Sequence, residues 1–131
     1  MKKLLFLGVL ALISLSVSAQ ISFSCTYREY CDWNEYSETF TNCSGYNESS
    51  LFVMNENETL FKHTTETISS TYYVQSREYD KKNDVYTYFV TSDVGNKYYY
   101  VFDLKNKEIR VLLTGDKGKT QLLRFYIKAI F

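Results

Sequence analysis

The clearest folding pattern in the chain lies in two stretches, EIRVLL (residues 108–113) and TQLLRFYIKAIF (residues 120–131). In both, apolar residues alternate with polar or charged ones, such as Arg110 and Lys128. A period of two residues predicts β-strands with one dry face and one wet face. The predicted dry faces carry Ile109, Val111 and Leu113 in the first strand, and Leu123, Phe125, Ile127, Ala129 and Phe131 in the second.

Working outward, the sequence between residues 49 and 108 also reads as strands joined by short turns. Val, Ile, Thr, Tyr and Phe, which favour pleated sheets, are abundant there. Gly95-Asn96 is a strong hairpin signal between two such stretches. Short connections join antiparallel neighbours, because a parallel pair needs a crossover of about a dozen residues or more. We predict strands at residues 50–54, 59–63, 67–77, 85–91, 97–104, 108–113 and 120–131, with a further strand at residues 21–28.

These strands predict an all-β fold, an antiparallel up-and-down meander of about seven or eight strands. The meander forms either a curved sheet or a small closed barrel. Closure removes exposed sheet edges, and the chain contains no proline to protect such edges. Residues 49–131 are expected to form the meander, with residues 20–48 as a cysteine-containing segment packed on it.

Residues 1–19 have the features of a signal peptide. Lys2 and Lys3 precede an apolar run at residues 4–17, and Val17-Ser18-Ala19 supplies small residues for cleavage before Gln20. No later apolar stretch reaches the roughly 18 residues that a membrane helix needs. We therefore expect an exported protein, periplasmic or extracellular, with no transmembrane segment in the mature chain.

The charge balance argues against nucleic acid as a class of partner. The sequence has 15 basic and 15 acidic residues; two of the basic ones are Lys2 and Lys3, which leaves 13 basic against 15 acidic after cleavage. Nucleic-acid-binding domains usually carry a basic stripe or patch. Since this chain is nearly neutral, we predict no nucleic-acid partner.

Three cysteines remain after the predicted cleavage: Cys25, Cys31 and Cys43. In an oxidising compartment one disulfide is favoured, with three pairings open and the third thiol left over. One alternative is that the thiols stay unpaired, buried or exposed. The other is a zinc site completed by His63, but the spacing contains no short CxxC pair. We predict a disulfide, no metal site and no cofactor.

Tyrosine is the compositional outlier, with 13 copies. Its flat ring and single hydroxyl suit contacts with proteins or glycans. The competing interpretation is that these rings pack against one another across strands inside the fold. The candidate ligand-binding residues are Tyr72, Tyr73, Tyr86, Tyr88, Tyr98, Tyr99 and Tyr100.

No catalytic arrangement is recognisable in the sequence. His63 is the only histidine, and no GxSxG, HExxH or catalytic-cysteine motif accompanies it. Two acidic turns, around Asp80 and Asp103, hold oxygen ligands that calcium takes, but neither has EF-hand spacing. Turns favour Asp and Asn in any case. The sequence therefore predicts a protein that is not an enzyme.

Parts of the chain resemble a group of bacterial proteins. Met1-Lys2-Lys3 and the cleavage sequence before Gln20 are similar to those of exported proteins of Bacteroidetes. Residues 50–55 through 103–109 resemble the small uncharacterised secreted β proteins of these bacteria. The resemblance implies a secreted β domain and brings no active site with it. In a bacterium, the three Asn-x-Ser/Thr sequences at Asn42, Asn47 and Asn57 are polar loop residues and not glycosylation sites.

Together these features favour an exported, non-catalytic binding or interaction module with a tyrosine-rich β surface and a protein or glycan partner. The alternative is a carrier of a small apolar molecule, with a lipocalin-like barrel around its ligand. The sequence leaves the oligomeric state open.

Overall fold

The computed structural model describes residues 20–114 and 118–131. Eight antiparallel strands follow one another in chain order and close into a barrel, with β8 returning to pair with β1. The predicted all-β meander is confirmed, and of the two forms left open the sheet takes the closed one. The strands are β1 (Ile21–Asn34), β2 (Thr39–Met54), β3 (Leu60–Thr64), β4 (Ser69–Asp80), β5 (Val85–Ser92), β6 (Lys97–Asp103), β7 (Glu108–Thr114) and β8 (Thr120–Ile130).

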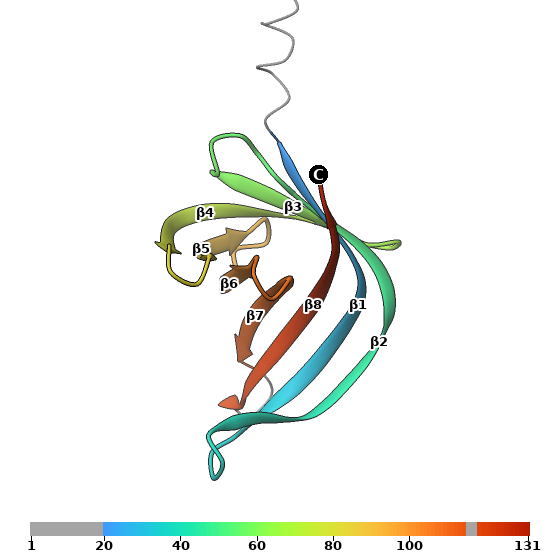
Figure 1. Cartoon of the computed structure of the whole chain (residues 1–131), viewed down its shortest axis with the longest axis vertical. Coiled ribbons are helices and arrows are strands. Elements are labelled where there is room, and N and C mark those ends of the chain that lie inside the picture. The colour runs from blue at the N-terminus through green and yellow to red at the C-terminus, as the bar shows by residue number, and fades with distance from the viewer. Residues whose placement is uncertain (1–19, 115–117) are drawn as a thin grey trace, which may run out of the picture.

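The strands differ greatly in length, and this shapes the barrel. β1, β2 and β8 form a long curved sheet on one side, while β3 is the shortest strand (Figure 1). β2 pairs with β1 along its length but meets β3 only from Leu51 to Met54. Among the described strands, none lies beside one edge of β2 over much of its length.

The cysteine-containing segment is part of the barrel wall. β1 pairs with β2 on one side and with β8 on the other, so residues 21–34 close the barrel. β2 begins at Thr39, well before the predicted start at residue 50. Residues 39–49 are polar and show little alternation, but they pair with β1 across the turn at residues 35–38. A disulfide between Cys31 and Cys43 links the two strands near this turn.

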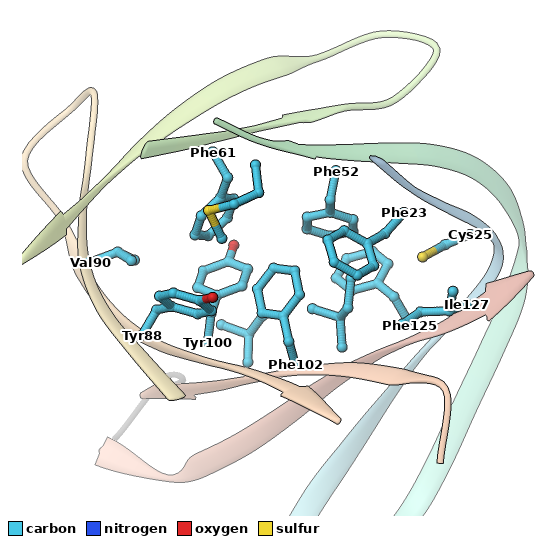
Figure 2. Close-up of a cluster of buried hydrophobic side chains, with 13 residues drawn as sticks. Phe23, Cys25, Phe52, Phe61, Tyr88, Val90, Tyr100, Phe102, Phe125 and Ile127 are labelled. Carbon is cyan, nitrogen blue, oxygen red and sulfur yellow. The ribbon is translucent and has the colours of Figure 1, made fainter. Parts of the chain in front are cut away.

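The interior of the barrel is filled by side chains, many of them aromatic. Phe52, Phe102 and Phe125 point toward one another from β2, β6 and β8 (Figure 2). The Phe52 ring lies 5.1 Å from that of Phe125 and 6.1 Å from that of Phe102, both edge to face. Such pairs contribute roughly 0.5–1.5 kcal/mol each beyond the burial of their area.

The dry faces predicted from alternation are the inner faces of β7 and β8. Ile109 and Val111 are buried, and Leu113 packs against the same core. Phe125 and Ile127 are buried too, with Leu123 beside them. The alternation ends with the barrel, because Ala129 and Phe131 are exposed.

Among the described residues, no helix has the length and apolar character that crossing a membrane requires.

Candidate functional site: an apolar row on the outer face

The seven candidate tyrosines divide between the two faces of the sheet. Tyr88 and Tyr100 are buried in the core, and Tyr72, Tyr86 and Tyr98 pack against it. Only Tyr73 and Tyr99 point outward, with exposed fractions of 47% and 53%. The seven side chains therefore do not form one continuous surface.

The inward tyrosines are packing residues with local polar partners. The Tyr88 hydroxyl donates a hydrogen bond to Glu58 Oε1 at 2.9 Å. Burial is the main cause that raises the pKa of Tyr88, and the Glu58 carboxylate is the second. The Tyr100 ring lies 5.0 Å from that of Phe61, and burial raises its pKa well above the usual value. Burial therefore makes ionisation of either hydroxyl still less favourable, and the neutral form suits a mostly apolar interior.

Tyr99 belongs to a row of apolar side chains that crosses four neighbouring strands on the outside of the barrel. Its ring lies 5.0 Å from that of Phe89 on β5. It is directly opposite Leu112 on β7, which in turn is opposite Leu122 on β8. We call Phe89, Tyr99, Leu112 and Leu122 the outer row. Tyr99 and Leu112 are exposed, Phe89 is half-buried and Leu122 is buried. With strands about 4.8 Å apart, the row is roughly 15 Å long.

Two surface hollows lie along the outer row, and Leu112 lines both. The larger has a volume of about 630 Å³, and the smaller one of about 340 Å³. The larger is lined by Phe89, Asn96, Lys97, Tyr98, Tyr99, Leu112, Leu113 and Thr120. The smaller is lined by Phe40, Val101, Glu108, Arg110, Leu112, Leu122 and Arg124.

The β1–β2 hairpin extends this apolar surface. Phe40, which lines the smaller hollow, packs edge to face on Trp33 with ring centroids 5.0 Å apart. Trp33 is itself partly exposed. The disulfide holds the hairpin strands together near this pair, since Cys31 and Cys43 lie on β1 and β2 just inside it. Aromatic side chains thus stand at both ends of the surface.

A ladder of alternating charges borders the row on the same outer face. Arg110 Nη1 lies 2.9 Å from both Asp103 and Glu108, and Arg124 lies 2.6 Å from Glu29. Arg124 Nε is also 3.6 Å from Glu108, which joins the two halves. Because each arginine is shared between carboxylates, the ladder fixes side chains across β1, β6, β7 and β8 beside the apolar row.

Within this ladder Asp103 is nearly buried. Burial alone would raise its pKa, but hydrogen bonds from Asn106 and Arg110 outweigh that effect and lower it. Asp103 and Asp80 also accept hydrogen bonds from backbone N–H groups of their own turns. The oxygens that suggested a calcium ligand set are thus engaged in turn formation, as such residues commonly are.

The structure shows which two of the three cysteines are bonded, a choice that the sequence left open. Cys31 and Cys43 form the disulfide, and Cys25 is a buried free thiol. Burial raises the Cys25 pKa to about 12, which suppresses the reactive thiolate form. Glu29 lies close to both disulfide sulfurs, but a sulfur bonded to another sulfur is not the thiolate that zinc requires.

His63 lies inside the barrel wall, away from the cysteine pair that a zinc site would need. Its ring stacks on Phe52 at 4.0 Å and meets Phe125 edge to face at 4.9 Å. Burial, with a smaller contribution from the positive charge of Arg28, lowers its pKa to about 4. The histidine is therefore neutral at physiological pH and sits in an aromatic environment.

Comparison of the chain with protein-family models, with curated proteins and with solved structures finds no match. The site has therefore to be interpreted from its own geometry.

Of the outer row, the sequence pattern predicted only Tyr99 as a contact residue and gave no prediction for Leu112, Leu122 or Phe89. A signal for Leu112 was present, since it shares the wet-face phase of Glu108 and Arg110 and is nevertheless apolar. An apolar residue at a wet position marks an exposed apolar surface. Leu122 and Phe89 lie in strands that carry apolar residues at both sets of alternate positions. Alternation therefore could not show that these two side chains point outward.

Proposed function

We propose that this protein is an exported, non-catalytic binding module that recognises a protein partner through the outer row. The observation that carries the proposal is the direct opposition of Tyr99 and Leu112 on an exposed face, with exposed fractions of 53% and 42%. Large apolar side chains gathered on the surface of a small domain mark interaction sites more often than isolated ones do.

The composition of the surface favours a protein over a glycan. Aromatic residues are enriched at protein interfaces, and the energetically important ones gather at the centre inside a polar rim. Here Leu112 lines both hollows and Tyr99 lines the larger one, with the charged residues Lys97 and Arg110 in the larger and the smaller hollow, respectively. The exposed aliphatic side chain of Leu112 offers contacts that complement an apolar protein surface and supplies no hydrogen bonds to sugar hydroxyls.

A carrier function has less support from the interior. Phe52, Phe61, Phe102 and Phe125 are among the most fully buried side chains, and they occupy the space that an enclosed ligand would need. The rings of Phe61 and Phe102 are 5.5 Å apart across the barrel. A carrier of this shape would have to displace packed aromatic rings, each of which contributes to the core.

Export is supported by two independent features. The disulfide between Cys31 and Cys43 is typical of proteins that work in oxidising compartments. The sequence pattern expected of a signal peptide falls in residues 1–19, which lie outside the described residues. The partner is accordingly sought outside the cytoplasm.

The test is affinity capture from the native outer compartment, followed by measurement of binding to the partner recovered. A Tyr99→Ser/Leu112→Ser variant should bind at least about tenfold more weakly, since central interface residues commonly contribute 2 kcal/mol or more. Tyr73→Ser is the matched control, because Tyr73 is equally exposed but lies on β4 outside the row. Equal binding by the wild-type protein and the double variant would exclude the outer row.

A glycan array run on the same proteins separates the two partner classes. Saturable binding to a glycan that is lost in the double variant would keep the site but overturn the choice of a protein partner.

A further inference from the structure

Among the described strands, the edge of β2 beside β3 is uncovered for much of its length. β3 covers β2 only at residues 51–54, so residues 39–50 of β2 have a strand neighbour on the β1 side alone among the described residues. Backbone N–H and C=O groups on such an edge are free to pair with another strand. The side chains of residues 42–47 are exposed, so this edge is open to solvent.

A second open edge provides an internal comparison. β4 pairs with β3 only as far as Tyr73, which leaves residues 75–80 uncovered on that side. This edge carries Glu78 and Asp80, together with Arg77, which is ion-paired with Glu58. Charged side chains are one of the devices by which proteins keep sheet edges from pairing with other chains. The β4 edge is therefore protected.

The β2 edge lacks this protection. Between Cys43 and Ser50 the sole charged residue is Glu48, and the segment has no lysine and no proline. Glu48 does not act as a free edge charge, because its Oε1 accepts a hydrogen bond from Arg28 Nη1 at 3.0 Å. The open stretch is thus electrically neutral toward an approaching strand.

We propose that the β2 edge pairs with the same edge of a second copy of this chain, forming a two-fold symmetric dimer. An antiparallel pair of identical strands satisfies a two-fold axis, and a neutral edge brings no like charges together. The left-handed backbone of Asn42, with φ 55°, ends the regular stretch on one side, and pairing with β3 ends it at Leu51 on the other. The two-fold axis passes close to Tyr46, near the middle of this stretch.

The proposal does not rest on the outer row. That row lies on the faces of β5 to β8, whereas the contact proposed here uses the backbone edge of β2. A dimer of this kind presents two outer rows, and either proposal can fail without the other.

The test combines sedimentation velocity with amide hydrogen exchange over a range of protein concentrations. We expect the wild-type protein to reach the mass of a dimer, with protection of amides in residues 43–50 that increases as the dimer forms. Asn47→Lys/Ser49→Lys places two lysines on each edge and should give a monomer. Gln75→Lys/Ser76→Lys, on the β4 edge, is the matched control and should still dimerise.

If the β2 double variant does not fold, Ser44→Lys is a single change on the β2 edge that should also give a monomer. A wild-type protein that stays monomeric up to its solubility limit would overturn the proposal. A dimer whose residues 43–50 exchange equally fast at every concentration would also overturn it. The same holds if the β4 variant abolishes dimerisation while the β2 variants retain it.

Discussion

Tyr99 on β6 lies directly opposite Leu112 on β7, and both side chains point away from the barrel interior. Tyr100, the next residue along the chain, points inward and packs on Phe61 and Tyr72. Two adjacent tyrosines therefore have different roles, one in the surface and one in the core. The difference gives the first prediction.

Tyr100→Ala should lower the free energy of unfolding by about 3–5 kcal/mol, as removal of a buried aromatic ring does. Tyr99→Ala should lower it by about 1 kcal/mol or less, because its main contact is one cross-strand ring. Urea unfolding followed by tyrosine fluorescence measures both. Equal losses of stability would show that the outward tyrosine is a structural residue and weaken its assignment to a binding surface.

Gly45 is predicted to be intolerant of any side chain. The ring of Tyr27 lies over it, and a Cβ atom there would be 2.6 Å from Tyr27 Cζ and 2.7 Å from the carbonyl oxygen of Arg28. Gly45→Ala should therefore destabilise the protein by about 1–3 kcal/mol, the range typical of overpacking.

Thermal or urea unfolding checks this, with Ser44→Ala as the control on the neighbouring exposed residue. The loss should be smaller in a Tyr27→Ala background, where only the backbone contact remains. If Gly45→Ala costs no more than Ser44→Ala, the close packing of Tyr27 on β2 is wrong.

The native protein should show no thiol that reacts rapidly with a disulfide reagent at pH 8. Cys25 is 1% exposed and burial raises its pKa to about 12, while Cys31 and Cys43 are bonded to each other. Thiol titration should count one sulfhydryl group per chain in denaturant and three after reduction. Two or more reactive thiols without reduction would contradict the disulfide.

The pH dependence of stability should carry a contribution from His63. Its pKa is about 4 in the folded protein, compared with about 6.5 in an unfolded chain. Well above pH 6.5 the imidazole is neutral in both states, so its titration does not change the stability there. Between pH 6.5 and 4 the unfolded chain binds the proton and the folded protein does not, so stability falls by up to about 1.4 kcal/mol per pH unit.

The groups that face His63 are Arg28 and Glu48, whose charges act on it, and the rings of Phe52 and Phe125. His63→Gln removes the titration and should flatten the profile between pH 6.5 and 5, before most carboxylates titrate. Parallel profiles for the wild-type protein and His63→Gln would contradict a buried neutral histidine.

Much of the architecture could be predicted because the strand period is explicit in the sequence. Ile109, Val111 and Phe125 alternate with charged residues, and their burial follows directly. Closure into a barrel could not be read from local pattern, since it depends on the pairing of β1 with β8 across nearly the whole chain. The same pairing explains why residues 21–34 are part of the wall.

The candidate site was harder to predict, and tyrosine content alone was a poor guide. In Tyr98-Tyr99-Tyr100 every position is bulky, so alternation gives no direction and the dry face is ambiguous. Only the three-dimensional neighbours decide, since Tyr98 and Tyr100 meet Tyr72 inside the barrel while Tyr99 meets Phe89 outside. Composition predicted an aromatic protein, and the strand register determined which rings reach solvent.

The most direct test of the outer row is site-specific photo-cross-linking in the intact native compartment. A photoreactive amino acid is placed at Leu112 in one variant and at Tyr73 in another, both exposed positions on the barrel. We predict a discrete protein adduct from position 112 and none from position 73. Adducts from position 73 alone, or none from 112 while the partner is captured normally, would contradict a binding surface centred on Tyr99 and Leu112.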